Sequence, residues 1–169
     1  MNWKELRLQV LLRHADDRLV LGHRLSEWCG HGPTLEEDIA LSNIALDLLG
    51  QAQIIFKESI KEDARNRSVD DLVYFRDVHS YRNVIFVEQP NRDFAFTILR
   101  QYLFDVFNRL WLGALSVSVD DALVSFAKQA LKEAIYHERH SKSWVIRLGD
   151  GTDESHTRIQ EAVAVLYPL

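Results

Sequence analysis

The residues of this chain that could do chemistry are a few carboxylates and one histidine, spaced along segments of helical pattern. A di-iron centre inside a helical bundle takes one Glu from each of two helices and a Glu-x-x-His pair from each of the other two. The i, i+3 spacing is needed because residues about one turn apart share a helix face. This sequence holds the remains of that pattern at Glu27, Asp47, Gly50, Asp105, Ala134 and His137.

The ligand set is incomplete. Gly50 stands where the second helix should supply a histidine, and Ala134 stands where a carboxylate should precede His137. We therefore expect no di-iron centre, no bound metal and no catalytic residue in this chain. A single metal remains an alternative, with Glu133 assisting from four residues before His137. The other alternative for His137 is a core histidine that bonds a carboxylate, with Asp105 and Glu27 as the candidate partners.

A second group of polar side chains lies at Ser80, Tyr81, Arg82 and Asn83. An aromatic ring, a guanidinium and two hydrogen-bonding side chains could together meet an anionic, nucleotide-like ligand. These four residues are the candidate substrate-binding residues, and the alternative for them is an ordinary loop. The chain has no nucleophile elbow, no phosphate-binding P-loop and no dinucleotide fingerprint.

Five helical segments must position these residues. Apolar residues recur at spacings of three and four, and turn or capping residues separate the segments. We expect the first helix over residues 4–29 and the second over about thirty residues from Thr34. The third is expected from 93 to about 117, the fourth over 121–149 and the fifth over 152–166. The polar run from Arg13 to Arg18 would allow a bend in the first helix. Residues 61–92 form a long connection, with a short helix expected over 72–77. On the third helix the predicted inward stripe is Leu99, Tyr102, Leu103, Val106, Leu110 and Trp111.

This order of elements predicts an all-α fold. A long connection between the second and third helices lets them run parallel, which is typical of the ferritin-like four-helix bundle with a long crossover. The segment 152–166 would be an additional C-terminal helix. We expect one domain over residues 1–169, because a chain of this length can bury a single core.

Composition narrows the class of protein. The chain has 169 residues, a formal net charge of −5 and a single cysteine, Cys29. A negative charge argues against nucleic acid as a partner, because nucleic-acid binding usually needs a basic face. One cysteine excludes an internal disulfide, so we expect a reduced, cytoplasmic location. No apolar run is judged long enough to span a membrane, so we expect no membrane partner.

Long strings of this sequence resemble a known family. They are Arg24-Leu25-Ser26-Glu27-Trp28-Cys29-Gly30-His31, the stretch from Asp38 to Ala52, Val87-Glu88-Gln89-Pro90-Asn91, and Arg147-Leu148-Gly149-Asp150-Gly151-Thr152. The chain resembles, over nearly its whole length, the PaaC-type subunit of the bacterial phenylacetyl-CoA oxygenase. Members of that family extend further at the C-terminus, so part of the family domain is expected to be missing here.

The resemblance implies a ferritin-like, non-catalytic subunit of a complex that epoxidises the ring of phenylacetyl-CoA in aerobic phenylacetate degradation. It implies that the iron sits in a related PaaA-type catalytic subunit, that this chain holds no cofactor, and that it self-associates or binds further subunits. Residues 80–83 match a stretch that the coenzyme A part of the substrate approaches near the subunit interface. Two alternatives stay open, namely an independent metal-binding oxygenase with a degenerate site and a module that only binds coenzyme A thioesters.

Overall fold

The computed structural model describes residues 2–169, and these residues form helices and turns without a strand. This confirms the all-α prediction. The chain divides into two compact units, unit 1 up to Glu88 and unit 2 from Gln89 to Leu169. The ferritin-like four-helix bundle and the single domain over residues 1–169 depend on how the two units pack together, and they stay predictions.

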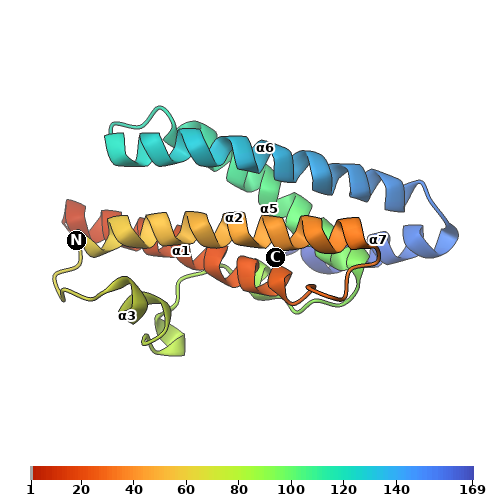
Figure 1. The fold of residues 1–169 in the computed structure, drawn as a ribbon, viewed down its shortest axis with the longest axis horizontal. Helices are drawn as coiled ribbons and strands as arrows, with labels where there is room; N and C mark the ends of the chain where they lie inside the picture. The colour runs from red at the N-terminus through yellow and green to blue at the C-terminus, as the bar shows by residue number, and fades with distance from the viewer. Residues whose placement is uncertain (1) are drawn as a thin grey trace. The chain divides into compact units, whose positions relative to one another are not determined.

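Unit 1 is a helical hairpin followed by a segment of short helices. Helices α1 (Trp3–Ser26) and α2 (Leu35–Ile60) run side by side in opposite directions (Figure 1). The following segment holds α3 (Val69–Val73), the 3₁₀ turn η1 (Val78–Ser80) and α4 (Ile85–Glu88). Each buried leucine or isoleucine contributes roughly 1.5–3 kcal/mol. The fully buried aliphatic side chains of the hairpin are Leu11, Leu21, Leu25, Leu41, Ile44, Leu48 and Ile55.

Helix α1 ends earlier than the predicted residue 29. After Ser26 the backbone changes to i→i−3 bonds, since Trp28 N–H donates to the Leu25 carbonyl and Cys29 N–H to the Ser26 carbonyl. Gly30 then takes a left-handed conformation with φ of 81°, and its N–H donates to the Asp38 carboxylate at 2.9 Å. Glu27 therefore lies at the C-cap, beyond the last helical residue.

The polar run in the first helix does not interrupt it. Helix α1 continues through residues 13–18, and Asp16, Asp17 and Arg18 are all buried. Arg18 falls in the same helical register as buried Leu11, Ala15, Gly22 and Leu25. When a charged residue falls at a position of the apolar stripe of a helix, the sequence indicates that its side chain is buried and bound to a partner.

The short helix after α2 lies a few residues before its predicted position of 72–77. Helix α3 begins after Ser68 because Ser68 and Asp71 form a reciprocal capping box. The Ser68 side chain accepts from Asp71 N–H at 3.1 Å, and the Asp71 carboxylate accepts from Ser68 N–H at 2.8 Å. The helix then ends at Val73, so residues 74–77 are turn rather than helix.

Unit 2 consists of α5 (Phe94–Leu115), α6 (Asp121–Gly149) and α7 (Asp153–Leu166), with α7 folding back against the other two helices (Figure 1). Helices α5 and α6 begin where the sequence predicted, at N-caps Asp93 and Asp120, whose side chains accept from Phe96 N–H and Leu123 N–H. Thr152 caps α7 in the same way.

Of the inward stripe predicted for α5, Leu99 is buried and Leu110 is 59% exposed, while the other four members are half-buried, namely Tyr102, Leu103, Val106 and Trp111. The buried positions include three polar residues, Gln101, Asp105 and Asn108, on the same stripe as Phe104 and Leu112. Asp105 was expected in the interior, whereas Gln101 and Asn108 were not predicted there. Hydrogen bonds to α5 and α6 side chains stabilise Gln101 and Asp105 in the interior.

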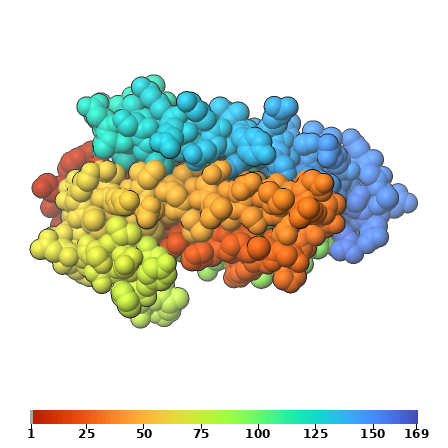
Figure 2. Space-filling model, in the orientation of Figure 1, coloured from red at the N-terminus to blue at the C-terminus, as the bar shows by residue number. Residues whose placement is uncertain are grey.

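Among the described residues, α2 is the one helix long and apolar enough to cross a membrane by length and composition. Of its most apolar window 44% is buried, and the core helix of a soluble protein passes the same test. The outer side of α2, orange to yellow in Figure 2, lies on the molecular surface. Its exposed apolar residues are Leu35, Ile39, Leu46 and Ile54. The expectation of no membrane partner stays a prediction.

Candidate functional site

Within unit 1, the predicted metal positions lie at or near the surface. Glu27 is exposed, and its carboxylate pairs with Arg24 Nη1 at 2.9 Å. Asp47 is half-buried on α2, and Gly50 is exposed, with nothing within 4 Å of the place that a Cβ would take. Glu27 is therefore committed to a salt bridge at a helix end, and Gly50 marks an open surface rather than an interior ligand position.

Within unit 2, Asp105, Ala134 and His137 are all completely buried, as the sequence pattern predicted. Asp105 on α5 is held by two neutral side chains. Its Oδ1 accepts from Gln101 Nε2 at 2.6 Å, and its Oδ2 lies 2.8 Å from Ser141 Oγ of α6. Asp105 was one of the two carboxylates predicted as a partner for His137, but these two hydrogen bonds go to Gln101 and Ser141 instead. We call Gln101, Asp105 and Ser141 the neutral network.

The neutral network is consistent with a protonated Asp105. Burial raises the pKa of the Asp105 carboxyl well above its usual range, and the nearby Glu138 charge raises it further, against the hydrogen bonds from Ser141 and Gln101. Ser141 Oγ also lies 2.9 Å from the His137 carbonyl oxygen. A hydroxyl has one hydrogen, so when Ser141 donates to that carbonyl, the protonated Asp105 can donate to Ser141 Oγ.

These residues do not fit a di-iron centre. Bridging two irons requires ionised carboxylates, whereas Asp105 is desolvated and both of its oxygens are engaged by side chains. In the described part of the chain, no three His, Cys, Asp or Glu side chains gather closely enough to hold a metal ion. The single-metal alternative with Glu133 gains no support from this arrangement.

A different pair of buried carboxylates lies in unit 1 and positions the segment that contains residues 80–83. Asp16 is fully buried and forms a two-pronged ion pair with Arg76, of which the Nη1 bond measures 3.0 Å. The Asp16 carboxylate also accepts from the backbone N–H of Arg82 at 2.8 Å. One buried carboxylate thus fixes both a guanidinium and the backbone of the candidate substrate-binding segment.

Asp17 fixes the next part of the same segment. Its carboxylate accepts from Val84 N–H at 2.8 Å, directly before α4. Burial raises the pKa of Asp17 to about 6. Beside it, Arg18 is completely buried and donates to Gln51 Oε1 of α2 at 3.0 Å, while burial lowers the pKa of Arg18 to about 10. We call Asp16, Asp17 and Arg76 the anchor.

The four candidate substrate-binding residues have different surroundings. The Tyr81 hydroxyl donates to the Val73 carbonyl, and its ring lies 4.2 Å from the Arg76 guanidinium, so this side chain is used inside unit 1. Asn83 Nδ2 donates to the Val84 carbonyl at 3.3 Å. Ser80 and Arg82 are exposed, and both line a surface hollow of about 520 Å³.

This hollow, which we call the basic hollow, brings together residues far apart in sequence. It is lined by the start of α1, the loop after α2 and the segment before α4. Its basic residues are Lys4, Arg65, Arg67, Arg76 and Arg82, and its acidic residues are Glu5, Glu62 and Asp63. Sequence reasoning found Arg82 and missed Lys4 and Arg65, because no local pattern connects residues that only the hairpin brings together.

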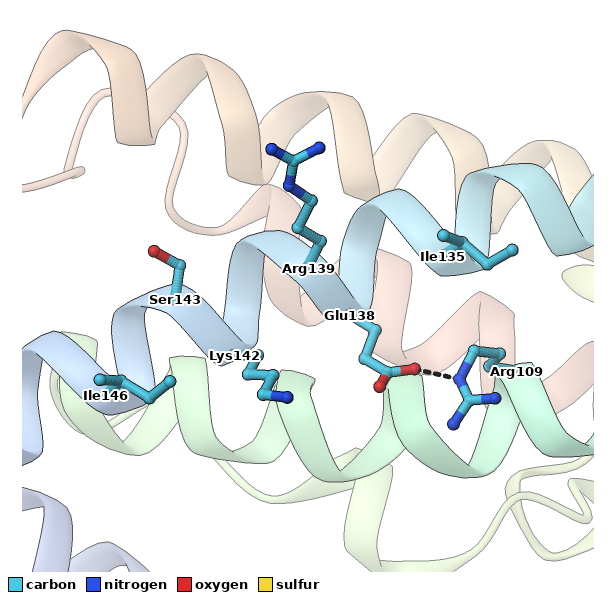
Figure 3. A pocket seen from close by; sticks show the side chains of 7 residues that line it. All are labelled: Arg109, Ile135, Glu138, Arg139, Lys142, Ser143 and Ile146. Atoms are coloured by element: carbon cyan, nitrogen blue, oxygen red, sulfur yellow. Dashed lines mark hydrogen bonds and ion pairs between the residues drawn. The ribbon is translucent and has the colours of Figure 1, made fainter.

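A second hollow of about 550 Å³ lies on α6 of unit 2 and contains Arg109, Glu138, Arg139 and Lys142. Arg109 is engaged in an ion pair with Glu138. Figure 3 shows Glu138 and Lys142 extending toward α5, while Arg139 and Ser143 extend to the other side of α6. The cations of this hollow diverge, so they make a poor site for a single anion.

Comparison with known proteins agrees with the resemblance found in the sequence. The family described as "Phenylacetic acid catabolic protein" matches residues 2–169. The chain is also 46% identical, over 156 residues, to the C subunit of 1,2-phenylacetyl-CoA epoxidase from Escherichia coli (strain K12). That match covers 92% of this chain and 62% of the relative, so the chain spans less than two thirds of the relative's length. The resemblance to PaaC-type subunits is confirmed, and the chain belongs to the phenylacetic acid catabolic protein family.

Proposed function

We propose that this chain is a non-catalytic structural subunit of a multicomponent phenylacetyl-CoA epoxidase. It pairs with a related di-iron catalytic subunit and keeps that subunit in its active arrangement. The observation that carries this proposal is the neutral network: where a di-iron helix pair would present charged ligands, unit 2 presents a desolvated Asp105 held by Gln101 and Ser141.

Two further observations support a structural role for this chain and a metal site in the partner subunit. Gly50 and Ala134 have no ligand atom at positions where the metal pattern requires one, and Glu27 is paired with Arg24 at a helix end. We therefore propose that the chain holds no cofactor, that the iron belongs to the partner subunit, and that the complex works in the cytoplasm. The relative is named as one of the subunits of an epoxidase, which supports a role inside an assembly.

The outer face of α2 supports partner binding. Leu35 and Leu46 are 69% and 66% exposed, and Ile39 is 52% exposed, on a helix whose other side is buried. Contiguous exposed apolar residues usually mark a protein interface. We propose that this face contributes to contacts between subunits, including contacts with the di-iron subunit or with further copies of this chain.

Iron content tests the proposal. The chain is purified alone and after co-expression with the related di-iron subunit, and iron is measured in both samples. We expect substoichiometric iron in the isolated chain and iron in the complex, together with epoxidation of phenylacetyl-CoA by the complex alone. Stoichiometric metal in the isolated chain would favour the independent metal-binding oxygenase and contradict the structural role.

A variant on the exposed face of α2 tests whether this face is needed for assembly. Leu46→Glu places a charge on the exposed face of α2, and we expect weaker assembly and lower activity with unchanged iron per catalytic subunit. The matched control is Val119→Glu, because Val119 is 97% exposed in the turn before α6 and lies outside that face. If the Leu46→Glu variant caused the partner subunit to lose iron, this chain would be needed for the metal site itself, which contradicts a purely structural role.

The second candidate function is a module that only binds coenzyme A thioesters. The exposed Arg82 and Ser80 in the basic hollow favour it. It predicts binding of coenzyme A by the isolated chain and no dependence of the epoxidase on this subunit. Full activity of the di-iron subunit without this chain would support it over the structural role.

A further inference from the structure

We infer that the exposed side of α6 is a docking surface for an acidic helix of a partner protein. Six exposed residues form this surface, which we call the outer seam. Successive members are alternately four and three residues apart, which is the spacing that lets one helix pack along another. The members of the outer seam are Lys128, Lys132, Ile135, Arg139, Lys142 and Ile146.

The outer seam lies opposite the side of α6 that packs inside unit 2. With 3.6 residues per turn, residues two apart point to nearly opposite sides of a helix, as exposed Ile135 and buried His137 do. The buried side, which we call the inner seam, follows the same spacing. Its members are Ala127, Ala130, Ala134, His137 and Ser141. Helix α6 therefore has the pattern of a helix that packs on two sides, and only the inner seam is buried.

The charges of the outer seam are unbalanced. Its four cations form no salt bridge with any residue that the structure describes. The carboxylate in the adjoining hollow, that of Glu138, is already paired with Arg109. The seam itself contains no carboxylate, although the formal net charge of the chain is −5. Four cations without partners along one side of a helix favour a negatively charged partner.

The apolar residues of the outer seam lie in the hollow of about 550 Å³ on α6. Ile135 and Ile146 line this hollow, and each is 52% exposed. Figure 3 shows Lys142 extending toward α5 and Arg139 extending to the other side of α6. Charged side chains flank a narrow apolar strip in the same way in paired helices. Cations that diverge from such a strip suit several carboxylates along a partner helix better than one small anion.

The length of the outer seam also suits a helix. From Lys128 to Ile146 it extends for about 27 Å, so a partner helix of about eighteen residues can lie along it. A second copy of this chain does not fit through the same face, because the four cations of one copy would meet those of the other.

Two other classes of anionic partner fit less well. Helices that bind membrane surfaces insert Trp, Phe or Leu side chains, whereas the outer seam offers two isoleucines and the inner seam of α6 is buried. Nucleic acid is repelled by a chain with a net charge of −5. An acidic protein helix therefore agrees best with the charge, the spacing and the apolar strip.

A designed peptide is the probe for this inference. It has about 21 residues in heptads, with leucine at positions a and d and glutamate at positions e and g, and the glutamates keep it from pairing with itself. Fluorescence anisotropy measures its binding to the full chain, beside a control peptide with lysine in place of every glutamate. We expect the acidic peptide to bind, with an affinity that falls as salt is added, and the lysine peptide not to bind.

Charge reversal tests whether the peptide binds at the outer seam. Arg139→Glu combined with Lys142→Glu should weaken binding of the acidic peptide at least about tenfold, because two attractions become repulsions. The same variant should bind the lysine peptide more tightly than the parent does. The matched control combines Lys57→Glu with Arg65→Glu, two exposed cations of unit 1 without a salt bridge to any described residue, and it makes the same change in net charge. The control should bind the acidic peptide as the parent does, with circular dichroism confirming that both double variants fold.

Several results would overturn the inference. They are a failure of the acidic peptide to bind, equal binding of the two peptides, and an unchanged affinity in the Arg139→Glu, Lys142→Glu variant. Tighter binding to phosphatidylserine vesicles or to duplex DNA than to the acidic peptide, lost in the same variant, would assign the seam to a membrane or to nucleic acid and also overturn it.

The peptide measurement is independent of the proposed structural role, because it needs neither iron nor the di-iron subunit. Stoichiometric iron in the isolated chain would remove that role and leave the outer seam in place. A failed peptide titration would remove the docking surface on α6 and leave the structural role in place.

Discussion

The two units bury carboxylates in opposite ways. In unit 1 the anchor residue Asp16 is fully buried beside the Arg76 guanidinium and a backbone N–H, so it is compensated by a cation. In unit 2 Asp105 is equally buried, yet within the described residues its oxygens meet an amide and a hydroxyl and no cation. The anchor holds residues 76–84 against α1. The neutral network instead joins α5 to α6 through hydrogen bonds between uncharged side chains. The charge state and the structural role of a buried aspartate therefore depend on whether its partner is a cation or a neutral group.

The largest effect is expected from removing the anchor's charge. Asp16→Asn leaves Arg76, whose side chain is 3% exposed, as a buried cation without its carboxylate. Breaking a buried pair from one side costs about 3–5 kcal/mol, so we expect a loss of that size in the free energy of unfolding measured with urea. Proteolysis within residues 74–84 should also become faster.

Arg158→Gln is the control for Asp16→Asn, because Arg158 pairs with Asp93 and Glu154 at an exposed position. Exposed ion pairs contribute little, so this variant should unfold at nearly the parental urea concentration. An equally small loss for Asp16→Asn would mean that the anchor does not fasten the segment.

A second prediction concerns the pH dependence of Asp17. The folded pKa is about 6, above the usual 3.8, so the folded state holds this proton more tightly than the unfolded chain. Stability from this group is therefore present below pH 4 and is lost as the pH rises through 6, by about 3 kcal/mol. Asp17→Asn keeps an acceptor for Val84 N–H without ionising, so it should exceed the parent in stability at pH 7 and match it near pH 4.

The difference between variant and parent is the quantity to measure across pH. Burial lowers the pKa of His14 to about 3, so stability from His14 is lost as the pH falls below 6.5, which opposes the effect of Asp17. Both proteins contain His14, and its contribution cancels in the difference. A difference that stays constant from pH 4 to pH 7 would show that Asp17 does not titrate in this range.

A smaller effect is expected at the cap of α3. Ser68→Ala removes the side chain that accepts from Asp71 N–H, which should cost about 1 kcal/mol. Because the anchor holds the later part of the segment, hydrogen exchange should speed up in residues 69–73 and stay slow at Arg82 and Val84. Equal acceleration at all of these amides would mean that the cap and the anchor act as one unit.

The smallest effect is expected at the neutral network. Asp105→Asn exchanges a protonated carboxyl for an amide of nearly the same shape, which can still accept from Gln101 and donate to Ser141. We expect a change below about 1 kcal/mol in unfolding free energy at pH 7. Ser141→Ala is the matched comparison and should cost more, because it leaves a buried carboxyl oxygen without its partner. A loss at Asp105→Asn as large as at Asp16→Asn would show that Asp105 is ionised and would remove the contrast between the units.

Local sequence patterns predicted much of the helical structure. The predicted helix starts lie within one or two residues of the observed ones, where Thr34, Asp93, Asp120 and Thr152 act as N-caps, because a cap depends on residues within one turn of each other. The buried seam of α6 follows from its spacing for the same reason, and Ala134 and His137 are buried as expected. Helix ends shifted at Glu27 and before α3, where a glycine turn and a capping box outweighed the apolar pattern.

The sequence by itself determined the helices, the family and the incompleteness of the metal ligand set, since each depends on residue types at short or fixed spacing. Tertiary structure alone decided the partners of the buried charges. Asp16 meets Arg76 across 60 positions, and Lys4 reaches the same hollow as Arg65 and Arg82 only because the α1–α2 hairpin returns the chain to its start. A carboxylate's charge state depends on what lies around it in space, and no local spacing specifies that.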